Sequence, residues 1–202
     1  MVTRTSPIRI GVLGTHATGK SLLMRRIEME LRSRGIPVAR TGGLGRRAAQ
    51  VPLPKMHNHT VESTRWVLAT GIADEVAAAA SLDQSGPVRV VLADRASWDA
   101  LAYHRAALEW RGHTASRTDH ESLHNLAAAI TYDLLFATTL NITIPVEPKH
   151  DYDDRYRRLV DQHTHALLHE ENLPHVRVTA RDDSKELAIA HALHLCSTEA
   201  LV

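Results

Sequence analysis

The sequence predicts an α/β fold in which a five-stranded parallel β-sheet lies between two layers of helices. Apolar runs of strand length alternate with segments of helical spacing along the chain. The apolar runs are nearly unbroken, which is typical of parallel strands covered on both faces. A glycine-rich loop also joins the first apolar run to the first helical segment. Together these observations favour a three-layer α/β/α architecture.

The predicted elements follow one another in a regular order. Strands are expected at residues 8–13, 38–41, 88–93, 134–138 and 176–179. Helices are expected at residues 20–34, 61–82, 97–110, 121–132, 155–169 and 184–196. Gly35 is a natural C-cap for the first helix and Thr60 an N-cap for the second, while the proline-containing segment 50–60 predicts a loop. No linker divides the chain, so we expect one domain over residues 1–202 with a lid-like segment at about 145–160.

Composition limits the classes of function. The net charge of +1 gives no general attraction to nucleic acid or to a membrane surface. Residues 1–7 lack the apolar core of a signal peptide, and no run approaches the roughly 20 apolar residues of a membrane span. A single cysteine, Cys196, fits a reducing compartment. We therefore expect a cytoplasmic protein without nucleic-acid or membrane partners; the oligomeric state is open, a homodimer included.

The segment Gly14–Ser21 has the spacing G-x-x-x-x-G-K-S of a phosphate-binding loop. Its glycines allow backbone N–H groups to point at a polyphosphate, and the following helix directs the positive end of its dipole at the same anion. Lys20 would reach the terminal phosphates, and the hydroxyl of Ser21 would ligate Mg²⁺. The residues expected to bind ATP and Mg²⁺ are Gly14, Thr15, His16, Ala17, Thr18, Gly19, Lys20, Ser21 and Leu22. The choice between ATP and GTP is open, with the base expected near Thr138 and Arg181.

Asp94 stands at the end of the third predicted strand, where it can complete a phosphate-loop site. It would hold Mg²⁺ through water or accept a proton from an attacking hydroxyl. The alternative role for Asp94 is to cap the helix that follows.

Arginines near the strand ends are further candidates. Arg46 and Arg47 lie in the glycine-rich segment 42–47, which is either a ligand-binding loop or a flexible connector. Arg155 and Arg158 share a helix face, so they would either close over a transferring phosphoryl group or form a solvated helix start.

The segment from Asp94 to Tyr103, D-R-A-S-W-D-A-L-A-Y, resembles the D-R-S-x-x-D-x-L-A-Y segment of the ribosylnicotinamide-kinase-like P-loop proteins. These are relatives of the thymidylate and deoxynucleoside kinases. Thr60, Trp66 and Glu75 fall where that family has a T…W…Q…E helix, and Asp154-Arg155 resembles the D-G-x-R segment of its lid helix. The resemblance implies the P-loop kinase fold, with strand order 2-3-1-4-5, and ATP-dependent phosphorylation of a small molecule.

Two positions depart from the pattern of this family. The acid of its E-x-x-R segment is replaced by Gly43, and its helix glutamine by Gly71. Both positions face the acceptor in the relatives, so the smaller side chains would admit a bulkier or differently charged compound. Loss of the acid beside surviving arginines favours an anionic acceptor, with Arg46 or Arg47 gripping it.

The leading hypothesis is an ATP- and Mg²⁺-dependent phosphotransferase acting on a nucleotide, a nucleoside or a related biosynthetic intermediate. Its predicted catalytic residues are Lys20, Asp94, Arg95, Arg155 and Arg158, with Ser21 and Asp94 at the metal. Its predicted acceptor-binding residues are Arg46, Arg47, Glu75, Trp98 and Asp99. The rival hypothesis is a non-catalytic or slowly hydrolysing nucleotide-binding regulator. An enzyme should have a closed acceptor cavity near Asp94, lined by Arg46, Trp98 and Asp99, which a regulator should lack.

Overall fold

A computed structural model describes residues 6–84, 86–144 and 153–198 of the chain. Its main sheet consists of β1 (Ile8–Leu13), β2 (Val38–Thr41), β5 (Val90–Ala93), β6 (Leu134–Thr138) and β7 (Val176–Val178). The helices are α1 (Lys20–Ser33), α2 (Leu44–Gln50), α3 (Val61–Ala79), α4 (Ser97–Arg111), α5 (Arg117–Ala127), α6 (Asp154–Glu170) and α7 (Asp182–Thr198). A short 3₁₀ helix, η1 (Met56–Asn58), and a hairpin of β3 (Leu82–Asp83) and β4 (Gly86–Pro87) complete the described elements.

All neighbouring strands of the five-stranded sheet run parallel, in the order β2-β5-β1-β6-β7. Counted along the chain, this is the predicted order 2-3-1-4-5, so the fold prediction is confirmed. Strand β1 is central, since Ile10 pairs with Leu92 on one side and with Leu134 on the other. The carboxyl ends of β1 and β5 therefore meet at one edge of the sheet, where open α/β sheets bind their ligands.

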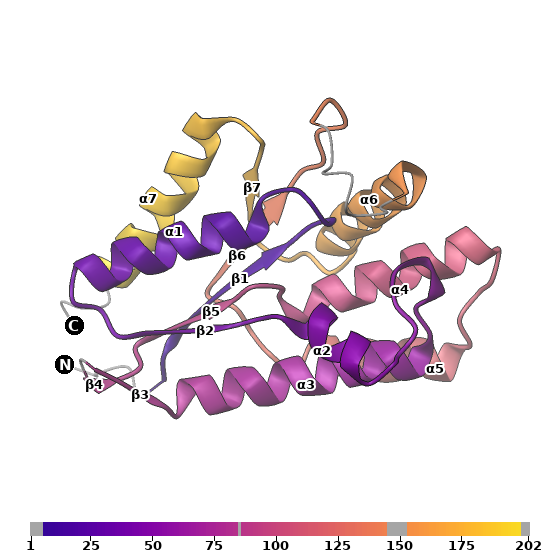
Figure 1. Cartoon of the computed structure of the whole chain (residues 1–202), viewed down its shortest axis with the longest axis horizontal. Helices are drawn as coiled ribbons and strands as arrows, with labels where there is room; N and C mark the ends of the chain where they lie inside the picture. Colours follow the sequence, from indigo (N-terminus) through magenta and orange to yellow (C-terminus); the bar gives the residue numbers. More distant parts are fainter. Residues whose placement is uncertain (1–5, 85, 145–152, 199–202) are drawn as a thin grey trace.

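Two helical layers cover the sheet (Figure 1). Helices α1 and α7 pack on one face, where Ile10 and Val12 join a buried cluster with Ile27. Helices α3, α4, α5 and α6 lie on the other face, where Leu13 joins a second cluster with Leu101. The alternation of Ile10, Val12 and Leu13 between clusters follows the two-residue period of a strand. Both faces are therefore apolar, which explains the unbroken apolar runs in the sequence.

Several predicted element boundaries need correction; the helix expected to end at residue 132 ends at Ala127, and the strand expected from residue 88 begins at Val90. The glycine-rich segment at residues 42–47 is partly helical, because α2 begins at Leu44 and continues to Gln50. The helix expected to reach residue 82 ends at Ala79 and is followed by the β3–β4 hairpin. The helix expected at 121–132 begins at Arg117, because the Ser116 side chain caps it by accepting a hydrogen bond from the N–H of Asp119.

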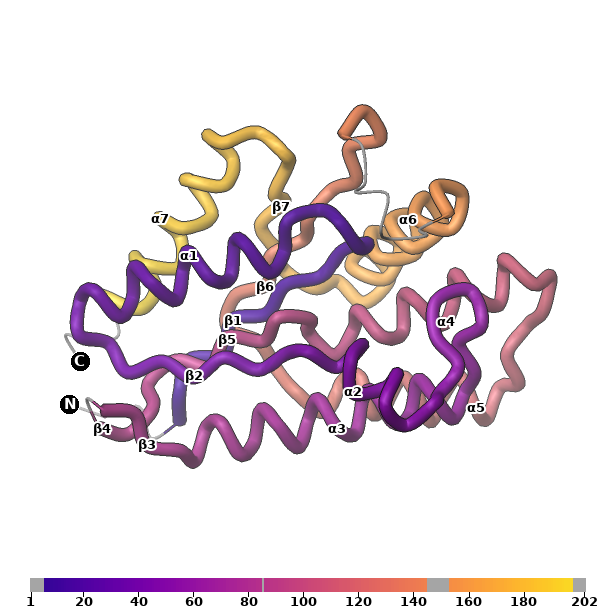
Figure 2. The backbone as a smooth tube through the Cα atoms, in the orientation of Figure 1, coloured from indigo at the N-terminus to yellow at the C-terminus, as the bar shows by residue number. Residues whose placement is uncertain are grey.

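The segment between β2 and α3 crosses the outside of the α3–α4 layer, as the tube in Figure 2 shows. The helix that follows it begins as predicted, with Thr60 and Ser63 forming a reciprocal capping box. The crossing brings α2 onto α3 and η1 onto α4. It therefore covers the side of these helices nearest the carboxyl edge of the sheet.

The predicted lid-like segment is only partly described. Residues 145–152 lie outside the described part of the chain, and α6 starts directly after them. The Asp153 side chain caps α6 by accepting a hydrogen bond from the N–H of Tyr156.

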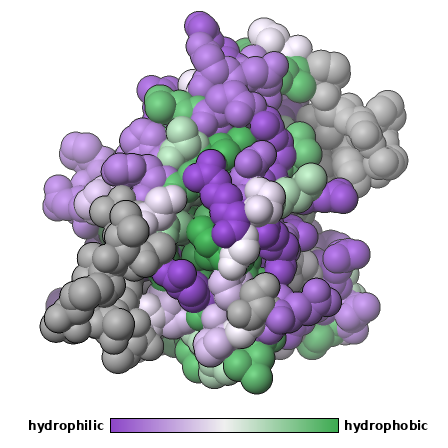
Figure 3. Space-filling model, turned by 90° about the vertical axis from the view of Figure 1, so that its left-hand side faces the viewer, coloured by the Kyte–Doolittle hydropathy of each residue, from purple (hydrophilic) through white to green (hydrophobic). Residues whose placement is uncertain are grey.

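The end of the molecule that carries the β3–β4 hairpin is mostly hydrophilic, with hydrophobic side chains between the hydrophilic ones (Figure 3). Leu82 of the hairpin is one of the exposed hydrophobic residues of the chain. In the described part of the chain, every helix is too short or too polar to cross a membrane.

Candidate active site

The loop between β1 and α1 has the geometry of a phosphate cradle. Gly14 and Gly19 adopt φ values of +137° and +84°, which favour glycine. A Cβ atom on Gly14 would overlap the hydroxyl of Thr138 on β6, so the loop passes directly against that strand. The Thr18 hydroxyl donates to the carbonyl of Thr15 at 2.8 Å and lies 2.7 Å from the Thr138 hydroxyl. The curl is therefore held both within the loop and by β6.

Lys20 lies inside this curl. Its side chain is 5% exposed, and its ammonium donates hydrogen bonds to the carbonyls of Gly14, at 2.6 Å, and Thr15. Burial lowers the pKa of Lys20 to about 7, and the positive charge of Arg95 contributes to the shift. Negatively charged phosphates at this position would favour the charged ammonium.

Ser21 and Asp94 meet at the carboxyl edge of the sheet. The Ser21 hydroxyl donates to the Asp94 carboxylate at 3.0 Å, although the residues are 73 positions apart. The second carboxylate oxygen of Asp94 lies 3.6 Å from Arg40 on β2. A hydroxyl and a carboxylate are oxygen ligands of the kind that Mg²⁺ prefers. The pair therefore fits a magnesium ion held between the loop and β5.

Asp99 ties the loop to α4 on the other side. Its side chain is 1% exposed and accepts the N–H of Gly14 at 2.9 Å. The same carboxylate accepts a hydrogen bond from Arg95, whose φ of +111° is strained for a residue with a side chain. The Arg95 guanidinium also lies over the ring of Tyr103, 5.0 Å from its centroid. Asp99 is thus a buried anchor that orients Arg95 and the first turn of the loop.

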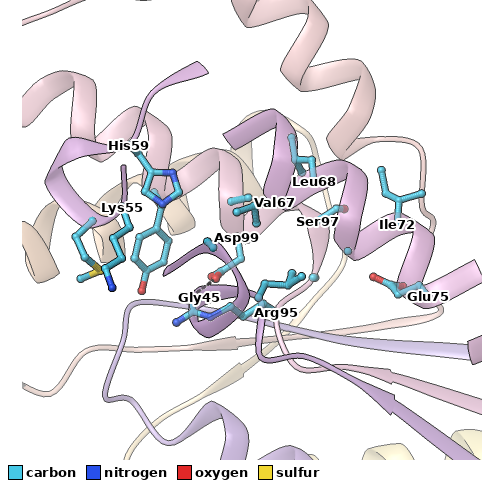
Figure 4. Close-up of a pocket in the computed structure, with 17 residues that line it drawn as sticks. Gly45, Lys55, His59, Val67, Leu68, Ile72, Glu75, Arg95, Ser97 and Asp99 are labelled. Carbon is cyan, nitrogen blue, oxygen red and sulfur yellow. Dashed lines mark hydrogen bonds and ion pairs between the residues drawn. The ribbon is translucent and has the colours of Figure 1, made fainter. Parts of the chain in front are cut away.

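A cavity of about 120 Å³ opens beside this anchor, between α2, α3 and α4. We name it the α3–α4 cavity. Figure 4 shows Lys55 and His59 at one end of it and Glu75 at the other. Its lining residues are Leu44, Gly45, Ala48, Lys55, Met56, His59, Val67, Leu68, Gly71, Ile72, Glu75, Arg95, Ala96, Ser97, Asp99, Ala100 and Tyr103. Through Asp99 and Tyr103 the cavity adjoins the phosphate loop.

Three residues expected to bind the acceptor do not line this cavity. Trp98 packs edge-on against His124 in the core, because adjacent helix residues point about 100° apart and Asp99 takes the cavity side. In α2 the buried Leu44 and Ala48 face inward, so Arg46 and Arg47 are exposed. Arg47 forms an ion pair with Asp74 on the outer side of α3. The structure therefore brings Glu75 and Asp99 to the cavity, but not Trp98, Arg46 or Arg47.

A second cavity, of about 350 Å³, lies on the opposite side of the loop. We name it the α1–β6 cavity. It is lined by Ala17, Thr18, Gly19, Leu22, Leu23, Arg26, Thr138, Thr139, Asn141, Ile144, Val178, Thr179, Ala180, Asp182 and Lys185. It includes Leu22 and lies where the base was expected, near Thr138 and beside Arg181. Asp182 and Lys185 form a 2.9 Å ion pair at this cavity.

The arginines of α6 are arranged differently from the prediction. Arg155 is exposed and stacks on Trp110, with the guanidinium 4.8 Å from the ring centroid, and Arg158 is exposed as well. The buried arginine is Arg157, whose side chain is 3% exposed and donates to Asp154 at 3.0 Å. Its Nε atom is buried without a hydrogen-bond partner among the described residues. The sequence analysis did not select Arg157, although the D-x-x-R spacing of Asp154 and Arg157 matches the D-G-x-R segment and could have identified it.

Tyr103 and His16 are further site residues whose contact the sequence did not reveal. The Tyr103 hydroxyl lies 3.2 Å from Nδ1 of His16. His16 occupies a variable position of the loop motif, and Tyr103 is one helical turn after Asp99. The four-residue spacing places Tyr103 on the cavity side of α4, but only the tertiary packing shows that its hydroxyl reaches the loop.

Within the described ranges, no group of three or more His, Cys, Asp or Glu side chains is arranged to hold a metal ion. Ser21 and Asp94 would supply two oxygen ligands, so phosphate oxygens and water would have to complete the coordination of Mg²⁺ there.

Comparison with solved structures identifies the fold class of the chain. No protein-family model and no curated protein matches the chain. Among solved structures, the NadR protein in complex with NAD and AMP-PNP matches 95% of this chain with a TM-score of 0.64 and 17% identity. Deoxyadenosine kinase from M. mycoides with bound dATP matches 91% of this chain and 98% of its own length, with a TM-score of 0.63 and 12% identity. This chain spans about half the length of the NadR chain. The matches show that it has the P-loop kinase fold implied by the sequence resemblance.

Proposed function

We propose that the chain is an ATP- and Mg²⁺-dependent phosphotransferase that phosphorylates a small molecule. The observation that carries this proposal is the pair of cavities flanking the phosphate loop. Gly14 belongs to both sides, because it packs against Thr138 of the α1–β6 cavity while its N–H bonds Asp99 of the α3–α4 cavity. A donor base in one cavity and an acceptor in the other would place the transferring phosphoryl group at the loop between them.

The donor side is supported by the lining of the α1–β6 cavity. Backbone N–H groups of the loop and the first turn of α1 would hold the phosphates, with Lys20 moving from its carbonyl partners onto them. The compared NadR structure holds NAD and the ATP analogue AMP-PNP, and deoxyadenosine kinase holds dATP in one structure and dCTP in another. AMP-PNP is the one that resembles a phosphate donor. We therefore infer an adenine nucleotide as the donor.

The chemical step requires an acceptor hydroxyl oxygen to attack the γ-phosphorus while the bond to the β–γ bridging oxygen breaks. Asp94 is positioned to receive the hydroxyl proton or to hold a water of the metal, and Ser21 would ligate Mg²⁺. The ion would neutralise charge on the β- and γ-phosphates. Arg95, held by Asp99, would stabilise the transferring group.

We also propose Arg157, rather than Arg155 or Arg158, as the arginine of α6 that faces the phosphates. Asp161 lies one turn further along α6, on the face that Arg157 shares. The Asp161 carboxylate accepts the N–H of Leu140, two residues after Thr138 of β6, at 2.9 Å, and its charge opposes the lowering of the Lys20 pKa. Both observations support a position of this face close to the loop. The unpartnered Nε of Arg157 is a donor that a phosphate oxygen would satisfy.

The α3–α4 cavity beside Asp99 argues against the rival regulator, because a regulator has no need of a second small-molecule site. Of the three residues expected to line such a cavity, only Asp99 does so. The single cysteine supports the cytoplasm as the compartment in which the enzyme acts.

Incubation with ATP, Mg²⁺ and a panel of nucleosides, nucleotides and other alcohols tests the proposal. Release of ADP should depend on an acceptor, and mass spectrometry should detect the phosphate on it. Lys20→Ala should lower turnover by about a thousandfold or more while the melting temperature is retained. Arg117→Ala, which removes an exposed ion pair with Glu121, is the control with normal turnover. Full transfer by the Lys20 variant would falsify the assignment, and acceptor-independent hydrolysis would favour the regulator.

A further inference from the structure

The walls of the α3–α4 cavity are predominantly apolar. Val67, Leu68 and Ile72 from α3 line it, as does Leu44 from α2. A Cβ atom on Gly71 would lie 3.2 Å from Cδ1 of Leu44, so the small residue at this position accommodates Leu44 rather than a larger ligand. In a site of this kind the few polar groups that are still free to bind determine which ligand is accepted.

The polar side chains toward one end of the cavity already have partners. One oxygen of the Glu75 carboxylate accepts the Tyr132 hydroxyl at 2.8 Å, and the other is buried 3.5 Å from Arg9. The Ser97 hydroxyl donates to the carbonyl of Ala127 at 2.6 Å. These groups hold the fold together, so they are not where a ligand is recognised.

The same holds for most polar groups next to the phosphate loop. Asp99 and Arg95 bind each other, and the Tyr103 hydroxyl contacts the loop. Lys55 is exposed, so water hydrates its ammonium group. The buried polar group of the lining that is still to be accounted for is the ring of His59.

The hydrogen bonds around His59 show which ring nitrogen carries the proton. The hydroxyl of Thr64 has one hydrogen, which it donates to the carbonyl of Thr60 at 2.7 Å. The same hydroxyl oxygen lies 3.2 Å from Nδ1 of His59, so it accepts there and Nδ1 is the donor. Burial, with the nearby charges of His104 and Arg95, lowers the pKa of His59 to about 4, so the ring is neutral at pH 7. The other nitrogen, Nε2, therefore has a lone pair and no hydrogen.

Nε2 of His59 is within reach of a ligand in the cavity. It makes no hydrogen bond to a described residue. The His59 ring keeps 8% of its surface exposed, and Figure 4 shows it pointing into the cavity beside Lys55. The two ring nitrogens of His104, by contrast, are enclosed by protein. A ligand that donates a hydrogen bond to Nε2 gains affinity, while one that lacks the donor leaves a mostly desolvated lone pair unmatched.

We propose that the phosphate acceptor is an alcohol with a second hydrogen-bond donor, an N–H or O–H group that binds Nε2 of His59, and that Thr64 fixes the tautomer that this requires. This inference rests on the proposed function. It makes His59 a specificity-determining residue in place of Arg46 and Arg47, which lie outside the lining.

The test uses two pairs of probes in which a methyl group replaces the donated hydrogen. Thymidine is compared with 3-methylthymidine, and 4-hydroxyphenethyl alcohol with 4-methoxyphenethyl alcohol. Binding is measured as the rise in melting temperature with AMP-PNP and Mg²⁺ present, and transfer as acceptor-dependent ADP release from ATP. We expect the member that keeps the hydrogen to bind about tenfold more tightly in each pair.

Two substitutions of His59 separate its ring nitrogens. In His59→Asn the amide can still donate to Thr64 in place of Nδ1, but no group replaces Nε2, so the preference within each pair should fall to about one. In His59→Gln the amide oxygen reaches the position of Nε2, so a preference of about threefold should return. His57→Asn changes a neighbouring histidine that does not line the cavity, and it should keep the full preference.

The tautomer is measured without any ligand. Nitrogen-15 NMR of the histidine-labelled protein at pH 7 should show a protonated Nδ1 and an unprotonated Nε2 for His59. Thr64→Val keeps the shape of the side chain and removes the hydroxyl, so part of the population should shift to the other tautomer and the preference should weaken. This measurement on the unmodified protein does not depend on whether a His59 variant folds.

Each result has a defined meaning. A protonated Nε2, absence of binding by both donor probes, or equal binding within the pairs would overturn the inference, and transfer to any other acceptor would leave the phosphotransferase proposal intact. An unchanged preference in His59→Asn would show that the methyl groups merely clash with the cavity wall, which would also overturn it. The expected preference without transfer of phosphate to any probe or other acceptor would sink the proposed function instead.

Discussion

The hydroxyl of Tyr103 lies 3.2 Å from Nδ1 of His16, so a residue that lines the α3–α4 cavity contacts the phosphate loop directly. The Tyr103 ring also lies under the guanidinium of Arg95. Its backbone carbonyl accepts the Tyr156 hydroxyl at 3.0 Å, which connects it to α6. An acceptor that touches this ring would therefore also stabilise one conformation of the loop.

Tyr103→Phe should raise the KM for ATP by about fivefold, because it removes one hydrogen bond of about 1 kcal/mol from the loop but keeps the ring. Steady-state kinetics measures the change. Tyr156→Phe is the matched control, since it removes a hydroxyl bonded to the carbonyls of Met56 and Tyr103 and not to the loop. It should lower the melting temperature and leave that KM unchanged. Equal effects of the two variants on the KM would contradict a positioning role for Tyr103.

Asp94→Asn should lower kcat by about a hundredfold or more, since the amide neither accepts a proton nor holds a metal's water as a carboxylate does. The Ser21 hydroxyl can still donate to the amide oxygen, so the melting temperature should stay within a few degrees. The Mg²⁺ dependence of turnover, measured by titration, should move to higher concentration. Asp74→Asn on the outer surface serves as control, and a normal kcat in Asp94→Asn would remove this residue from the mechanism.

Arg157→Gln should lower kcat by about a hundredfold if this side chain stabilises the transferring group. Arg155→Gln should change kcat by less than about twofold, because that guanidinium is engaged by Trp110. Both substitutions are on α6 and remove the same charge, but Arg157 is buried and Arg155 is exposed, so the melting temperature of each variant is measured beside its rate. Rates of the two variants under saturating ATP decide between them. A larger loss in Arg155→Gln would restore the arginine first expected from the sequence.

Gly14→Ala should destabilise the fold by about 3 kcal/mol, because the new methyl group would overlap the Thr138 hydroxyl and lie 2.9 Å from its carbonyl oxygen. Gly35→Ala is the control, since Gly35 also has a positive φ but nothing lies within 4 Å of its Cβ position. It should cost only about 1 kcal/mol. Urea denaturation measures both free energies of unfolding, and similar values for the two variants would contradict the close approach of the loop to β6.

Stability should fall when the pH drops from about 6.5 to 4. His59 and His104 are buried, and burial lowers the pKa of each to about 4 from an ordinary 6.5. In this window the unfolded chain binds more protons than the folded one, so stability rises with pH and is fully present above 6.5. Each histidine should contribute about 2–3 kcal/mol to the loss.

His104→Leu should flatten this pH dependence, because neither ring nitrogen of His104 has a hydrogen-bond partner among the described residues. Thermal unfolding from pH 4 to 8 measures the profile. His113→Leu replaces an exposed histidine and should leave the profile unchanged. An equally steep profile in His104→Leu would assign the acid sensitivity to other groups.

The phosphate loop and the sheet were predictable because their signals are local. The motif from Gly14 to Ser21, with an apolar run before it and helical spacing after it, specifies a strand, a curl and a helix within 30 residues. The cap at Thr60 and the strand at Leu134–Thr138 were likewise confirmed, since caps and apolar runs depend on neighbouring residues. The weaker helix at α2 was missed because two glycines precede and interrupt its short apolar pattern.

The sequence by itself determined which residue types stand at the proposed triphosphate site, namely a lysine and a serine on the loop and an aspartate at the end of β5. Only the tertiary structure decided which neighbours complete the site. In the tertiary structure Asp99 accepts the N–H of Gly14, and the Tyr103 hydroxyl contacts His16. Trp98, Arg46 and Arg47 do not line the α3–α4 cavity. The physical reason is that the contacts of Asp99 with Gly14 and of Tyr103 with His16 join residues 85 and 87 positions apart. Their direction is set by how α2, α3 and α4 pack on the sheet, which no local pattern encodes.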